Sequence, residues 1–298
     1  MRFQTVHTPT SLTEGPISQA LISFALPLLL GNLFQQLYNT ADSLIVGNFL
    51  GSEALAAVSS SGNLIFLMVG LVNGVSMGAG VVIARYFGAK DYDRMQKTIH
   101  TLLAFGLVAG VLLTVVGVAL SPVMLRLMDT PETVLPNSIS YFRTYFTGSL
   151  AFVLYNICMG ILQAVGDSRH PLQYLIISSL VNVVLDLIFV GVFHMGVWSA
   201  AAATAISQLV SMALCLLRLM RSERAYRVSL RKIRFDRRAL LEILQNGLPA
   251  GLQNSIISIG NVVVQSNINQ FGAAAMAGCG AHSRIEGFGF LPVTCFTM

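Results

Sequence analysis

The stretch TIHTLLAFGLVAGVLLTVVGVALSPVML, residues 98–125, contains no Asp, Glu, Lys or Arg and is rich in Leu, Val and Ala. Lys97 precedes it and Arg126 follows it. An α-helix needs about 20 apolar residues to cross the hydrocarbon core of a bilayer. The stretch is longer than that, so it predicts a membrane-spanning helix.

The same pattern recurs along the chain. No charged residue lies between Glu53 and Arg85, or between Asp186 and Arg218. Of the 298 residues, 54% are hydrophobic and only 10% are charged, whereas soluble domains average about 25% charged residues. Because only helices and closed barrels satisfy their backbone polar groups in lipid, these long runs predict an all-α, polytopic membrane helix bundle.

We expect eight membrane spans. Their approximate ranges are 17–49, 54–84, 98–125, 139–165, 172–193, 196–218, 241–269 and 273 onward. Pro27 and Pro249 lie near the starts of the first and seventh spans, where we expect them to kink the helices.

The orientation of the bundle follows from the connecting loops. Basic residues gather after the second, fourth and sixth spans, whereas the connections after spans one, three, five and seven contain only Arg126 among Lys and Arg. Positively charged loops stay in the cytoplasm. We therefore expect a multi-pass protein of the inner (cell) membrane with a cytoplasmic N-terminus.

The net charge of +5 could suggest a nucleic-acid partner. However, nine of the 18 Lys and Arg residues lie in one segment, from Arg218 to Arg238, between two predicted spans. Such a segment is typical of a cytoplasmic loop that fixes topology, so we expect no nucleic-acid binding.

An internal repeat divides the chain. Leu26-Pro27 corresponds to Leu248-Pro249, and residues 49–56 correspond to 270–277. The period is six spans, which predicts two lobes of like orientation. We expect a six-helix N-lobe over 1–218, a cytoplasmic basic loop over 219–240, and the first two helices of a repeated C-lobe over 241–298. A complete second copy would extend further, so we expect the sequence to be truncated.

Polar side chains within the spans mark a candidate site, because ionisable groups in a membrane are costly and usually functional. Asp42, Asp186 and Thr204 all fall roughly 10–12 Å below the outer surface at 1.5 Å rise per residue. Asn182 lies one turn from Asp186 on the same helix face. These oxygen-rich groups could bind a sodium ion or share a proton. Alternatively, they only hydrogen-bond helices to one another.

Other motifs indicate neither an enzyme nor a resident cofactor. Gly74-Val75-Ser76-Met77-Gly78 fits a nucleophile pattern, but it lies inside a predicted span and not on a strand-to-helix turn. With Gly70, its glycines form a stripe of small residues that favours helix packing. The four cysteines lie in apolar segments without a CxxC pair, which indicates reduced packing residues.

Several segments together resemble the multidrug and toxic compound extrusion (MATE) family. They are Pro27, residues 38–47 (YNTADSLIVG), 51–57 (GSEALAA), 88–92 (GAKDY) and 163–167 (QAVGD) with Pro171. The resemblance covers the chain from about Leu12.

The resemblance implies twelve helices in two lobes and export of small organic compounds, mainly cations, in exchange for protons or sodium ions. It places the N-lobe cation site on Asp42, Asn182, Asp186 and Thr204. Some branches of the family also have an acidic residue in the seventh helix, which residues 253–265 lack. We expect a monomer surrounded by membrane lipids.

Two other functions remain open. The first is a lipid-linked oligosaccharide flippase of the same superfamily, which would need basic residues in its cavity, and the N-lobe spans offer only Arg143. The second is an intramembrane enzyme, for which the spans offer no nucleophile–base pair.

Overall fold

The computed structural model describes the backbone of residues 17–297, and the side chains in that range except those of residues 17–25, 28, 60, 63, 67, 71, 284, 288 and 291–297. All of its regular elements are helices. They are α1 (Ile17–Leu50), α2 (Ser52–Gly88), α3 (Tyr92–Leu127), α4 (Leu135–Thr147), α5 (Ser149–Ala164), α6 (Arg169–Asp186), the π-helix η1 (Leu187–Val192), α7 (Trp198–Arg221), the 3-10 turn η2 (Leu230–Lys232), α8 (Arg237–Asn269) and α9 (Ala273–Thr297).

Seven of the eight expected spans coincide with one helix or with a helix and its continuation. The expected span 139–165 does not, because the chain bends by 51° between α4 and α5. Gly148 lies at this break and is followed by Ser149. Gly and Ser pairs are a common cause of sharp kinks, which explains why this expected span is a bent pair of helices and not one straight helix.

Length and composition alone identify fewer spans than the eight expected. Within the described residues, four helices contain a sufficiently long apolar window, and the bent pair α4–α5 makes a fifth. Helices α1, α8 and α9 are long enough but are not among them. In α8 the reason is its many amide and hydroxyl side chains, including Gln253, Asn254 and Gln265.

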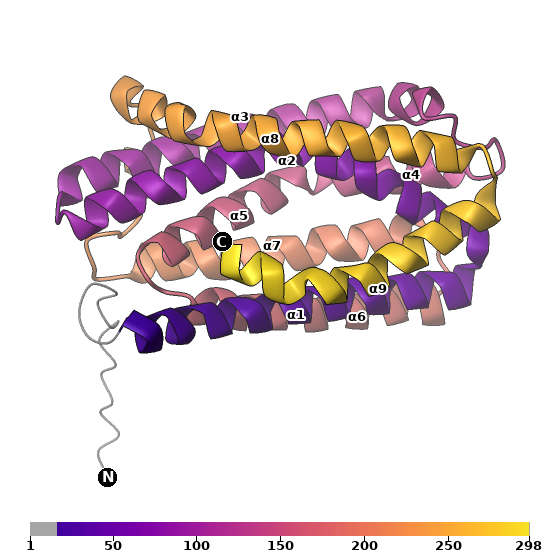
Figure 1. Cartoon of the computed structure of the whole chain (residues 1–298), viewed down its shortest axis with the longest axis horizontal. Coiled ribbons are helices and arrows are strands. Elements are labelled where there is room, and N and C mark those ends of the chain that lie inside the picture. Colours follow the sequence, from indigo (N-terminus) through magenta and orange to yellow (C-terminus); the bar gives the residue numbers. More distant parts are fainter. Residues whose placement is uncertain (1–16, 298) are drawn as a thin grey trace, which may run out of the picture.

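The helices lie side by side, and their connections gather at two ends (Figure 1). Connections 89–91, 165–168 and 222–236 lie at the end where α1 begins, which we call the basic end. Connections 51, 128–134, 193–197 and 270–272 lie at the opposite end. The basic connections expected on one side of the membrane therefore lie together at one end of the bundle.

The surface of the bundle is apolar. Leu112 and Val115 of α3 are each 61% exposed, and Leu180 of α6 is 62% exposed. Exposed aliphatic side chains along the length of such helices suit contact with lipid. Inside the bundle, aromatic side chains such as Phe142 and Phe146 are completely buried, with ring centroids 4.7 Å apart.

The most extensive helix pair is α2 with α8, which lie side by side in Figure 1. A Cβ atom added at Gly74 would lie 2.2 Å from Gly251 Cα, and one added at Gly78 would lie 2.3 Å from Gly247 Cα. Small residues allow such close backbone approach in membrane helices. The stripe of small residues predicted from the sequence is thus confirmed as a packing surface.

The internal repeat has a structural counterpart at the opposite end. Gly51 joins α1 to α2 with φ of 88°, and Gly272 joins α8 to α9 with φ of 87°. These two glycines are equivalent in the repeat, and both adopt a backbone conformation that side chains disfavour. Pro27 and Pro249 also correspond, since each lies within a continuous helix.

Candidate functional site

Four polar residues of the expected cation site meet where α1, α6 and α7 pack together. Asp42 comes from α1, Asn182 and Asp186 from α6, and Thr204 from α7. Asn182 and Asp186 are completely buried, and Asp42 is 7% exposed. Helix α6 contacts both α1 and α7, so it lies between the other two contributors.

The carboxyl groups of Asp42 and Asp186 lie close enough to interact with each other. Two ionised carboxylates cannot hydrogen-bond, because neither supplies a donor. Their proximity in a buried position therefore favours binding of one proton or one cation, which removes the repulsion between two like charges. Such a pair can take up and release one positive charge.

The amide of Asn182 connects this pair to α7. Its polar atoms are best satisfied when the nitrogen donates to Asp186 Oδ2 at 3.2 Å and the oxygen accepts from the Thr204 N–H at 3.2 Å. In the reverse orientation the amide nitrogen faces Thr204 Oγ1 at 3.4 Å. The first orientation makes two bonds in place of one long one, so we assign it. Asn182 is then a donor to the carboxyl pair.

The backbone next to this cluster is irregular. Asp186 is the last residue of α6, and the π-helix η1 begins at Leu187. The π segment contacts α1 and α7, which carry the other two members of the cluster. Short π segments are rare and concentrate at functional sites. Nothing in the sequence of residues 187–192 distinguishes this segment from an ordinary helix end.

Thr204 has a second role in its own helix. Its Oγ1 donates to the Ala200 carbonyl oxygen at 3.1 Å. The structure thus brings together the four residues singled out in the sequence, and their role as a coupling-ion site stays a prediction.

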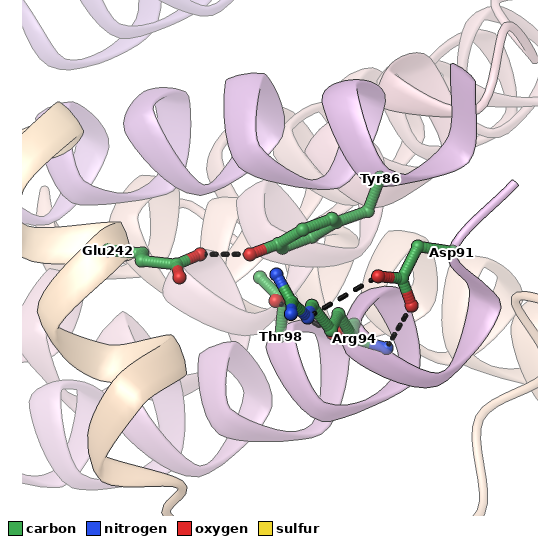
Figure 2. A network of polar contacts seen from close by, with 5 residues as sticks. All are labelled: Tyr86, Asp91, Arg94, Thr98 and Glu242. Atoms are coloured by element: carbon green, nitrogen blue, oxygen red, sulfur yellow. Dashed lines mark hydrogen bonds and ion pairs between the residues drawn. The ribbon is translucent and has the colours of Figure 1, made fainter. Parts of the chain in front are cut away.

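A second polar network joins α2, α3 and α8 at the basic end (Figure 2). The Tyr86 hydroxyl of α2 donates to Glu242 Oε2 of α8. Arg94 of α3 lies with its guanidinium 6.0 Å from the Tyr86 ring centroid and pairs with Asp91 at 3.4 Å. Sequence reasoning missed this network, because 156 residues separate Tyr86 from Glu242.

The nucleophile-like motif of α2 is structural. Ser76 is buried, and its hydroxyl donates to the Val72 carbonyl oxygen at 2.9 Å. Two motif glycines, Gly74 and Gly78, contact the backbone of α8. The hydroxyl is bonded within its own helix, as the packing interpretation requires.

The histidines and cysteines of the described spans also have structural surroundings. His100 Nδ1 bonds the Gln96 carbonyl at 2.8 Å, and its Nε2 accepts from the Ser229 N–H at 3.1 Å. Cys158 and Cys215 are buried free thiols. Both cysteines belong to the same apolar core cluster.

Comparisons with known proteins agree with this architecture. The chain is 31% identical over 282 residues to the probable multidrug resistance protein YpnP of Bacillus subtilis (strain 168), covering 94% of this chain and 62% of that protein. The chain therefore spans about three-fifths of the length of this relative. The relative is named for drug resistance and not for an enzymatic activity.

Solved structures of multidrug resistance MATE family transporters of the MOP superfamily have the same fold. An outward-facing structure matches with a TM-score of 0.82 and 28% identity, covering 94% of this chain and 62% of the other. An inward-facing structure matches with a TM-score of 0.80 and 29% identity, covering 88% and 60%. The family model MatE matches residues 27–188, which is more than half of the chain. The chain is thus a multi-pass membrane protein that belongs to the MatE family.

Proposed function

We propose that the protein of which this chain is a part exports small organic compounds, mainly cations, in exchange for protons or sodium ions. The observation that carries the proposal is the buried pairing of Asp42 with Asp186 between α1 and α6. A buried carboxyl pair needs one positive charge to be stable, so loading and unloading of that charge can be linked to a change of conformation.

The environment of the pair favours a proton over sodium as the coupling ion in this conformation. Asn182 directs its amide nitrogen toward Asp186, whereas a sodium ion would need an oxygen ligand at that place. Thr204 Oγ1 uses its hydrogen in the bond to Ala200, which leaves its lone pairs available to a cation. Sodium would therefore require the amide to rotate first.

The relatives favour drug export over lipid-linked oligosaccharide transport. YpnP and the two solved structures are named for multidrug resistance. Arg143, the basic residue that the flippase alternative would need, donates through Nε to Ser121 Oγ at 3.1 Å. An anionic pyrophosphate would have to displace this bond.

The test is drug efflux from proteoliposomes that contain the full-length protein under an imposed proton or sodium gradient. We expect Asp42→Asn to reduce gradient-driven efflux by roughly 5–150-fold, the factor that corresponds to a typical coupling free energy of about 1–3 kcal/mol. Asp186→Asn should act similarly. Asp129→Asn is the matched control, because Asp129 is an exposed acid outside the site. If Asp42→Asn keeps the wild-type rate and ion dependence, the site assignment is wrong.

A second variant separates the two coupling ions. Thr204→Ala removes an oxygen that sodium could use, but it leaves the carboxyl pair intact. We expect it to reduce sodium-driven efflux and to spare proton-driven efflux. Equal loss under both gradients would contradict a ligand role for Thr204.

A further inference from the structure

A hollow of about 550 Å³ opens at the basic end, between the start of α3 and the connection 222–236. The residues that line it all have polar or charged side chains. Its lining residues are Asp93, Gln96, Lys97, His100, Thr101, Arg231, Lys232, Arg234 and Asp236. Four of them are cations and two are carboxylates, so the wall has a surplus of positive charge.

The wall formed by the connection is fixed in place by hydrogen bonds to α3. His100 Nε2 accepts from the Ser229 N–H at 3.1 Å, and Thr101 Oγ1 accepts from the Asp236 N–H at 3.1 Å. His100 and Thr101 are both buried. The backbone on either side of Arg231, Lys232 and Arg234 is therefore anchored, which positions these cations over the hollow.

The cations are available to a ligand. Lys97, Arg231, Lys232 and Arg234 are exposed, and none of them forms a salt bridge with another described side chain. Asp236 offsets part of this charge, and its Oδ1 accepts from the N–H groups of Arg238 and Ala239 at the start of α8. With four cations and two carboxylates, the lining keeps a surplus of positive charge. Asp93 is the remaining acid of the lining.

A second hollow of about 620 Å³ lies beside the first and shares Gln96, Arg231 and Lys232 with it. It adds Arg227, whose Nε donates to the Met220 carbonyl oxygen at 3.1 Å. The shared cations can thus be reached from both sides of the connection. Two adjoining polar hollows suit a headgroup larger than a single ion.

Apolar side chains flank these cations. Leu230 is 53% exposed, Phe235 is 52% exposed and Leu241 is 50% exposed. In a membrane protein, exposed apolar residues next to Lys and Arg suit the boundary between lipid headgroups and acyl chains. A free soluble anion would make no use of them.

We propose that this hollow binds the phosphate of an anionic membrane lipid. Basic pockets between helices at the membrane surface recognise such headgroups. Arg231, Lys232 and Arg234 hold the phosphate from the connection, Lys97 holds it from α3, and Leu230 and Phe235 contact the acyl chains. The inference does not depend on what the protein transports or on its coupling ion.

The test uses purified full-length protein in neutral detergent, titrated with phosphatidylglycerol and followed by native mass spectrometry. The triple variant Arg231→Gln, Lys232→Gln, Arg234→Gln should bind phosphatidylglycerol on the order of fivefold more weakly for each charge removed. Lys97→Gln should weaken binding about fivefold from the opposite wall. Binding of zwitterionic phosphatidylcholine should be weak and equal in all variants.

The matched control is Arg221→Gln, Arg224→Gln, Arg237→Gln, which removes the same charge from exposed residues that line neither hollow. It should retain wild-type affinity. Equal weakening by the two triples would overturn the proposal, because diffuse attraction would then explain binding. Displacement of the lipid by inorganic phosphate would overturn the lipid assignment. Thermal unfolding without lipid checks that each variant is folded, and Lys97→Gln provides a single-residue test.

Discussion

Asp236 shows how one side chain can hold a connection and a helix together. Its Oδ1 accepts from the N–H groups of Arg238 at 3.1 Å and Ala239 at 3.0 Å, so it caps α8. Its own N–H donates to Thr101 of α3. The side chain starts one helix while the backbone is bonded to another, so the connection ends at a fixed place on the bundle.

The charge of this cap predicts a pH dependence. The backbone hydrogen bond from Ala239, with smaller contributions from Arg238 and Lys97 against some desolvation, lowers the pKa of the Asp236 carboxyl. A pKa that is lower in the folded state gives stability that is present above the unfolded pKa of about 3.9 and is lost as pH falls through the folded value. Asp236→Asn should therefore lower the unfolding temperature near neutral pH.

This difference between Asp236→Asn and wild type should shrink as the solution is acidified below about pH 4. Thermal unfolding in detergent across a pH series measures it. Asp129→Asn is the control, since it lies before α4, which begins without a side-chain cap. A destabilisation that stays constant down to the acid end would contradict a role for the carboxylate charge.

At the scale of elements, the backbones of α2 and α8 approach each other closely at their glycines. A Cβ at Gly78 would lie 2.2 Å from Gly247 N, and backbone atoms cannot move aside as a flexible side chain can. Ala gains about 0.5–1 kcal/mol over Gly in a helix, whereas overpacking costs about 1–3 kcal/mol. Gly78→Ala should therefore lower the unfolding temperature.

Gly80→Ala is the matched control in the same helix, because a Cβ there meets nothing within 4 Å. We expect it to leave the unfolding temperature unchanged or to raise it. If Gly78→Ala is as stable as Gly80→Ala, the two backbones do not cross as closely as described.

The Tyr86–Glu242 hydrogen bond links α8 to α2 at the basic end (Figure 2). Under the proposed exchange, a movement of α8 relative to α2 must break it. Hydrogen bonds to charged groups contribute roughly 1.5–3 kcal/mol, against about 0.5–1.5 for neutral ones. Glu242→Gln should therefore shift the protein toward conformations open at this end, and Tyr86→Phe should shift it further.

Spin labels at Lys90 and Arg237, two exposed residues at the basic end, measure this shift as a change in the distance distribution. Glu223→Gln is the control, because it removes an exposed carboxylate at the same end. An unchanged distance distribution in Tyr86→Phe would contradict a role of this hydrogen bond in holding α2 and α8 together.

The sequence was sufficient for helix positions but not for their interruptions. Charge-free runs such as 98–125 predict α3 because membrane burial excludes charge. The bend at Gly148 and the π segment after Asp186 depend on packing between helices, which leaves no periodic signal. Asp42 and Asp186 could be chosen from the cost of burying a charge, and Asn182 and Thr204 from helix face and depth. The Tyr86–Glu242 bond, in contrast, depends on which distant helices meet.

At the scale of the whole molecule, the distribution of charge gives the bundle two different ends. The basic end contains the segment from Arg218 to Arg238 with its nine cations, whereas the charged residues at or next to the connections of the opposite end are Arg126, Glu53, Asp129 and Glu132. The proposed lipid site and the network of Figure 2 both lie at the basic end. The orientation of the protein therefore decides which leaflet and which compartment these features face.

We predict that the basic end is cytoplasmic, because translocating clustered Lys and Arg is disfavoured. Two exposed positions serve as reporters, Arg224→Cys at the basic end and Asp129→Cys at the opposite end. Cys158 and Cys215 are buried, and the partly exposed Cys279 is replaced by Ser to reduce background. A membrane-impermeant thiol reagent should label Asp129→Cys in intact cells and Arg224→Cys only after permeabilisation. Labelling of both reporters at similar rates in intact cells would place the basic end outside. The anionic lipid site would then have to draw on the outer leaflet, and the Tyr86–Glu242 bond would close the outward side.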